Sequence, residues 1–60
     1  MLRAVGYDPK TRTLEVVFHT GEVYQYENVP ASEYQGLLNA KSVGQYMRAN
    51  IMDVYSYVRL

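Results

Sequence analysis

The sequence has no cysteine, a single histidine and only two prolines, and it contains no long apolar run. Without cysteine the chain can form neither a disulfide nor a thiolate metal site, which excludes the class of small secreted domains that disulfides stabilise. Its first residues lack the apolar segment of about 7–15 residues that marks a signal peptide. No stretch approaches the ~20 apolar residues of a membrane span. We therefore expect a cytoplasmic protein that does not associate with a membrane.

The length of 60 residues allows one small domain, which we expect to comprise residues 1–60. A domain of this size buries only about 60 % of the surface that its unfolded chain exposes. Its core therefore supplies roughly 3–5 kcal/mol of stability.

Charge is balanced overall but uneven along the chain. Six basic and six acidic side chains give no net charge, which argues against a strong non-specific polyanion binder. Residues 15–40 hold four glutamates and no Lys or Arg, whereas the segments on either side each carry a small positive excess. If the two ends meet in the fold, one side of the domain is mildly basic and the other acidic.

The inventory of chemically reactive side chains is small. His19 has no Asp, Glu or Cys near it at the spacing of metal ligands, and a catalytic histidine needs a nucleophile or carboxylate placed against it. Glu15 with Glu22 or Glu27 would be a pair of carboxylates, but they fall on outward positions of strands. The sequence therefore predicts a protein that is not an enzyme, with no catalytic residue, no metal site and no cofactor.

Three short segments have the composition of β-strands, namely RAVGYD (3–8), TLEVVF (13–18) and VYQYE (23–27). Asp8 and Pro9 favour a tight turn after the first segment, and Gly21 favours one after the second. Three strands joined by short turns form an antiparallel meander.

The turn at Gly21 decides which way Tyr24 and Tyr26 face. A two-residue turn places both tyrosines on the face opposite Phe18, whereas a three-residue loop, with Gly21 in the left-handed conformation, pairs Val16 with Tyr24. A two-residue turn would put the β-branched Thr20 at a position that needs positive φ. We favour the three-residue loop, and the two alternatives are exclusive because a one-residue slip moves every side chain to the other face.

Two helical segments follow. Pro30 opens the first, PASEYQGLLN, and Ser42 with Gln45 forms a capping box for the second, SVGQYMRANI. The final segment, VYSYVRL, either adds a strand or lies extended. The pattern predicts an α+β domain, a three-stranded antiparallel meander with two helices packed on one face. The predicted core consists of Val5, Leu14, Val16, Phe18, Tyr24, Tyr26, Val29, Tyr34, Leu38, Val43, Tyr46, Met47 and Ile51.

The order and spacing of several motifs resemble those of the KTSC domain family. The motifs are the central Tyr-x-Tyr of residues 24–26, Val29-Pro30, and the run from Ser42 through Gly44 to Tyr46, followed by Ile51 and Tyr55. Members of this family occur at the C-terminus of some lysyl-tRNA synthetases and as free-standing bacterial proteins. The resemblance implies a small binding domain, with RNA as the suggested ligand, either tRNA or single-stranded RNA. Met47-Arg48 stands where Phe-Asn is common in the family, and the tail is less basic than in many members.

Two groups of residues are candidates for contact with a nucleic acid. Lys41, Ser42 and Gly44 precede or open the second helix, where free backbone N–H groups and a cation favour an anion. Arg48, Tyr57 and Arg59 combine basic and aromatic side chains, as single-stranded RNA recognition requires. Plain helix capping and a fraying C-terminal tail are the structural alternatives for the two groups.

A second hypothesis is a protein-interaction module or homodimer. In the favoured register, Val17 and Val23 pair on the outer face of the sheet beside Gly6. Exposed β-branched residues on an open sheet favour association with a partner.

Overall fold

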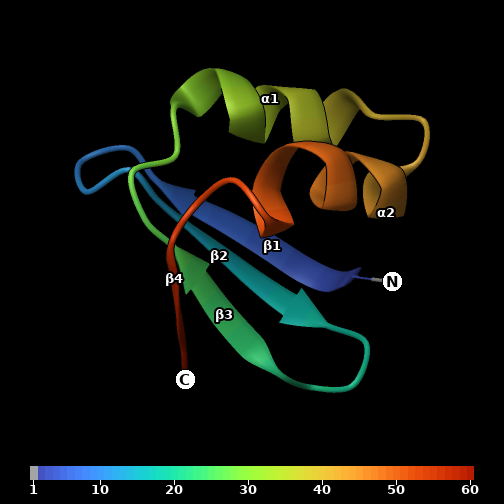
Figure 1. Ribbon diagram of the computed structural model, residues 1–60, viewed down its shortest axis with the longest axis horizontal. Helices are drawn as coiled ribbons and strands as arrows, with labels where there is room; N and C mark the ends of the chain where they lie inside the picture. The colour runs from blue at the N-terminus through green and yellow to red at the C-terminus, as the bar shows by residue number, and fades with distance from the viewer. Residues whose placement is uncertain (1) are drawn as a thin grey trace.

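The computed structural model describes residues 2–60, which form one antiparallel sheet with helices on one face (Figure 1). The strands are β1 (Leu2–Asp8), β2 (Thr13–Phe18), β3 (Val23–Tyr26) and β4 (Tyr57–Arg59), in the spatial order β1-β2-β3-β4. The helical segments are α1 (Ala31–Asn39), α2 (Val43–Tyr46) and η1 (Met47–Met52). The α+β class and the meander are confirmed.

Both predicted hairpin turns form as their residues suggest. Asp8 Oδ1 accepts a hydrogen bond from the backbone N–H of Lys10 at 3.0 Å. Gly21 has φ +94°, its N–H donates to the Phe18 carbonyl at 2.8 Å, and the Phe18 N–H donates to the Glu22 carbonyl at 2.9 Å. This is the three-residue loop, and it pairs Val16 with Tyr24.

The C-terminal segment adds a fourth strand, one of the two outcomes left open by the sequence. β4 lies antiparallel to β3, with Tyr57 opposite Tyr26 and Arg59 opposite Tyr24. The backbone N–H of Leu60 donates to the Val23 carbonyl at 2.9 Å, which extends the pairing beyond the strand. The sheet therefore has two edges, β1 and β4.

The second helix changes its hydrogen-bonding pattern midway. Ser42 is the N-cap as predicted, and its Oγ accepts from the Gln45 N–H at 3.3 Å. The sequence predicted a single α-helix here, and this prediction is wrong, because the chain continues beyond Tyr46 as a π-helix. The Asn50 side chain donates to the Tyr46 carbonyl at 3.4 Å, the acceptor that the Asn50 backbone N–H would bond in an α-helix.

Side chains from the sheet, both helical segments and the Val29 loop form the core. Two of the predicted core residues are exposed instead, Leu38 at 51 % and Val43 at 36 %, while Leu37 is buried in their place. The spacing of apolar residues in α1 does not by itself show which leucine faces the sheet. The fully buried core residues are Leu14, Val16, Tyr26, Val29, Leu37, Met47 and Ile51.

Gly36 permits close packing of the two helical segments. A Cβ atom at Gly36 would lie 2.1 Å from the hydroxyl of Tyr46. The neighbour that occupies this space is thus Tyr46 of α2. Within residues 2–60, no helix is both long and apolar enough to cross a membrane.

Candidate functional site

Four aromatic side chains gather on the helix-facing side of the sheet at its β4 edge, and we call them the tyrosine cluster: Phe18, Tyr24, Tyr26 and Tyr57. The rings of Tyr24 and Tyr57 are stacked, with centroids 4.9 Å apart and planes at 25°. Phe18 meets Tyr24 edge-on at 5.2 Å. Such contacts contribute about 0.5–1.5 kcal/mol each beyond burial, so the rings hold one another in position.

Exposure changes sharply across the tyrosine cluster. Tyr26 is 1 % exposed and belongs to the core, and burial is the main reason that its pKa is raised, with Tyr24 and Tyr57 nearby adding to the effect. Tyr57 is 51 % exposed, and its ring centroid lies 5.6 Å from that of Tyr26. The cluster therefore has a buried ring, that of Tyr26, and an accessible outer ring, that of Tyr57.

A cation lies beside the exposed ring. Arg59 lies two residues after Tyr57 on β4, on the same face of the strand. Its guanidinium Nη2 lies 2.7 Å from a carboxylate oxygen of Glu22. Both side chains are substantially exposed. An ion pair of this kind contributes only about 0–1 kcal/mol, so a competing anion can displace the carboxylate at little cost.

A surface cavity of about 260 Å³ adjoins the tyrosine cluster. Phe18, Tyr24 and Met52 supply its apolar wall, and His19, Thr20 and Glu22 from the hairpin loop supply polar groups. A planar group that stacks on the cluster would find both kinds of contact there.

The predicted nucleic-acid residues fall into separate places. Tyr57 and Arg59 lie together on β4 and join the tyrosine cluster, whereas Arg48 is an exposed residue of η1. The start of α2, which carries the second predicted group, lies on the opposite side of the domain from β4 in Figure 1. That second group is Lys41, Ser42 and Gly44.

At the start of α2, capping accounts for the serine. The Ser42 side chain already accepts the hydrogen bond of the Gln45 N–H. Lys41 is exposed beside a shallow depression that also involves Gln45 and Asn50.

Glu33 has a role that the sequence analysis did not identify. Its carboxylate accepts a hydrogen bond from the Tyr46 hydroxyl, and this bond is the main reason that the pKa of Tyr46 is raised. The pKa of Tyr55 is raised mainly by burial, with the negative charge of Glu33 as the next cause. These contacts tie α1 to the second helix and to the segment before β4, which is a structural function.

Phe18, Tyr24 and Glu22 were likewise not predicted as site residues. The strands that carry Phe18 and Tyr24 were predicted, but their exposure at the β4 edge depends on how far the short helices extend over the sheet. The alternation of Tyr57 and Arg59 with Ser56 and Val58 was the available signal that both side chains share one face.

Comparison with known proteins identifies relatives over nearly the whole chain. The KTSC domain family model matches residues 1–55. A protein of Stutzerimonas stutzeri is 49 % identical over 45 residues, which cover 75 % of this chain and 63 % of that protein. A lysine–tRNA ligase of Nostoc is 37 % identical over 59 residues, 98 % of this chain but 10 % of the ligase. The chain thus spans less than two thirds of the first protein and a tenth of the second.

A solved structure shows the same fold. The crystal structure of a KTSC domain protein from Yersinia pestis superposes with a TM-score of 0.92 at 32 % identity. The match covers 98 % of this chain and 83 % of the other.

Proposed function

The chain belongs to the KTSC domain family, and we propose that it is a non-catalytic module that binds single-stranded RNA through the tyrosine cluster. The observation that carries this proposal is the half-exposed ring of Tyr57, stacked on Tyr24 at 4.9 Å. One face of the ring is held by the protein, and the other is available to a nucleotide base. Stacking of a base on an aromatic side chain contributes about 1–3 kcal/mol.

Arg59 supplies the phosphate contact that stacking alone lacks. Guanidinium groups bind phosphate oxygens in a bidentate manner. The ion pair with Glu22 keeps the local charge near zero in the absence of a ligand and places Arg59 beside the aromatic surface. This balance agrees with the overall neutrality of the chain and predicts moderate, salt-sensitive affinity rather than tight non-specific binding.

The relatives support RNA as the ligand. The matched ligases of Nostoc and of Trichormus are named for lysine and tRNA, and in each the chain corresponds to about a tenth of the protein. A small domain attached to an enzyme that acts on tRNA is well placed to contact that RNA.

The proposal is tested by fluorescence anisotropy with a labelled, unstructured RNA oligonucleotide at low salt and near-physiological salt. Tyr57→Leu should weaken binding by about 5- to 150-fold, the equivalent of 1–3 kcal/mol. Tyr57→Phe keeps the ring and should bind as the wild type does. Glu22→Gln releases Arg59 and should strengthen binding by a few-fold at most, because it removes a surface ion pair of about 0–1 kcal/mol.

Absence of binding at low salt would overturn the proposal. Equal affinity of the wild type and Tyr57→Leu would also overturn it, because the stacking platform would then make no contribution. A loss of binding in Tyr57→Phe would show that the hydroxyl, not the ring, carries the contact.

Self-association through the outer sheet face is a second candidate, favoured by a specific observation. Val17 and Val23 lie directly opposite each other on that face, and β4 places the exposed Val58 and Leu60 beyond them. A second copy of the chain would cover this apolar strip. Sedimentation equilibrium should then show a mass that rises with concentration, and a monomer at all concentrations would exclude it.

A further inference from the structure

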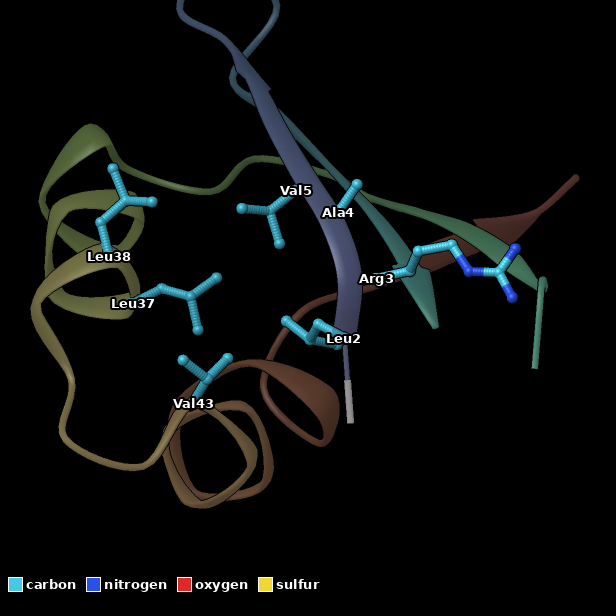
Figure 2. Close-up of a pocket in the computed structure, with 7 residues that line it drawn as sticks. All are labelled: Leu2, Arg3, Ala4, Val5, Leu37, Leu38 and Val43. Atoms are coloured by element: carbon cyan, nitrogen blue, oxygen red, sulfur yellow. The ribbon is translucent and has the colours of Figure 1, made fainter. Parts of the chain in front are cut away.

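A groove runs along the β1 edge of the sheet, at the opposite edge from β4. Leu2 and Val5 of β1 face Leu37 and Leu38 of α1 and Val43 of α2 across it, whereas Arg3 is turned toward the other side of the strand (Figure 2). Leu38 is 51 % exposed. Leu38 and Val43, both predicted to lie in the core, are thus exposed at this surface, and the buried Leu37 lies beneath them.

The backbone of β1 offers hydrogen bonds along the same edge. Along an antiparallel strand, the backbone groups of successive residues point alternately to one neighbouring strand and to the other. The hydrogen bond from the Phe18 N–H to the Glu22 carbonyl shows that Phe18, and with it every second residue of β2, bonds to β3. Glu15 and Val17 therefore bond to β1, opposite Gly6 and Ala4. It follows that the N–H and C=O groups of Val5 and Tyr7 point away from β2. No strand of residues 2–60 lies beyond β1.

The size of the groove favours side chains over a whole small molecule. Its volume is about 230 Å³, below the roughly 300–1,000 Å³ of typical small-molecule pockets. An extended chain that pairs with β1 would direct every second side chain into this space, toward Leu37 and Leu38.

Charge selects the chemistry of that chain. Arg3 lies on the outer face of β1, where its guanidinium donates a hydrogen bond to the His19 carbonyl at 3.0 Å and keeps its positive charge. Lys41 is exposed two residues before Val43. Residues of an added strand that face the outer side would lie near the Arg3 cation, and nearby opposite charges on adjacent strands are stabilising. A second copy of β1 would instead bring two basic segments together, because β1 and its turn carry Arg3, Lys10 and Arg12 against Asp8.

We propose that the β1 edge binds an extended acidic peptide segment of a partner protein, with apolar residues at alternate positions, which adds to the sheet as a fifth strand. Its apolar side chains occupy the groove between β1 and the helices. Its acidic side chains lie on the opposite face, beside Arg3. The bulge between Leu2 and Ala4 interrupts only the start of the strand and leaves the regular stretch from Val5 to Tyr7 for pairing.

The probe for the test is a capped peptide of alternating valine and glutamate, titrated into the isotopically labelled full chain and followed by NMR. We expect shift changes at the amides of Val5, Tyr7 and Leu38. Leu38→Glu places a carboxylate in the apolar groove and should weaken binding by at least about tenfold. Val54→Glu is the matched control, because Val54 is 60 % exposed and lies outside the groove.

A second probe tests strand addition itself. The same peptide, N-methylated at those alternate residues whose N–H groups would face β1, cannot donate backbone hydrogen bonds to β1 and should lose binding. Unchanged shifts at millimolar peptide, full binding to Leu38→Glu, or full binding of the N-methylated peptide would each overturn the proposal. Shifts at Val5 and Tyr7 that instead follow protein concentration without peptide would assign the edge to a second copy of the chain.

Discussion

The two edges of the sheet present opposite kinds of surface. The β4 edge carries stacked aromatic rings and an arginine whose partner is a surface carboxylate. The β1 edge carries aliphatic side chains and outward-pointing backbone groups beside a helix. Planar rings with a cation suit nucleotides, whereas an aliphatic groove along a free strand suits a polypeptide. One small core thus supports two surfaces of different chemical character, at opposite edges of the same sheet.

The largest effect should come from the residue beneath the β4 edge. Tyr26→Ala removes a ring that is 1 % exposed and should cost about 3–5 kcal/mol. That loss equals the whole stability expected for a domain of this size, roughly 3–5 kcal/mol, so the variant should be unfolded at 25 °C. Circular dichroism and urea denaturation measure it.

The exposed partner of Tyr26 provides the contrast. Tyr57→Ala should cost only about 1–3 kcal/mol, because it removes two aromatic contacts, with Tyr24 and with Tyr26, of about 0.5–1.5 kcal/mol each. If Tyr57→Ala unfolds the domain as completely as Tyr26→Ala does, then the ring of Tyr57 is part of the structural core. The distinction between a buried ring and an accessible ring at this edge would then be wrong.

A smaller effect is expected from two glycines on the β1 side. At Gly36 an added methyl group would meet the Tyr46 hydroxyl, and overpacking of about 1–3 kcal/mol exceeds the roughly 1 kcal/mol that alanine gains in a helix. At Gly6 nothing lies within 4 Å of an added Cβ. Gly36→Ala should therefore destabilise the domain, and Gly6→Ala should stabilise it by up to about 0.5–1 kcal/mol.

Denaturant midpoints of the two variants measure this difference. A stabilised Gly36→Ala would mean that the Tyr46 ring moves aside freely, and the helix pair that shapes the β1 groove would then be less rigid than the packing indicates.

Alkaline pH should produce the most gradual change, and it involves Tyr26 of the tyrosine cluster and Tyr46 between the helices. Folding raises the pKa of Tyr26 through burial and that of Tyr46 through the hydrogen bond with Glu33. The unfolded chain releases these protons near pH 10, so the stability they contribute is complete below about pH 10 and decreases as the pH rises further. Urea midpoints should therefore fall as the pH rises above about 10.

Tyr26→Phe is the control for this experiment because it keeps the ring and removes the ionisable group. Its stability should decrease less steeply with pH than that of the wild type. An identical pH dependence of the two proteins would show that Tyr26 ionises equally in the folded and unfolded chains.

Local rules were sufficient for the strands and their register but not for the docking of the helices. Thr20 and Gly21 contain the information for the loop, because the conformational preferences of single residues decide the turn. Whether Leu37 or Leu38 faces the sheet depends on the rotation of α1, which the distant contact between Gly36 and Tyr46 constrains. The spacing of apolar residues within α1 carries no information about this contact with α2.

The candidate site divides for the same reason. Tyr57 and Arg59 share a face because they are two residues apart on one strand, and their spacing in the sequence was enough to group them. The other predicted group, which includes Lys41 and Ser42, lies at the start of α2, and the tertiary arrangement places α2 on the other side of the domain from β4 (Figure 1). Phe18 and Tyr24 joined the site only through the coverage of the sheet, which is a property of the whole fold.

The loop at Gly21 has a consequence for how this domain can vary. Substitutions at His19 or Thr20 leave the number of loop residues unchanged and keep Tyr26 in the core. A slip of one residue in the pairing of β3 with β2 would reverse the facing of all of β3, which would expel Tyr26 and remove Tyr24 from beneath Tyr57. Tolerance at this loop should therefore depend on whether a variant keeps Val16 opposite Tyr24. A library that varies loop sequence and length should recover only variants that preserve this pairing.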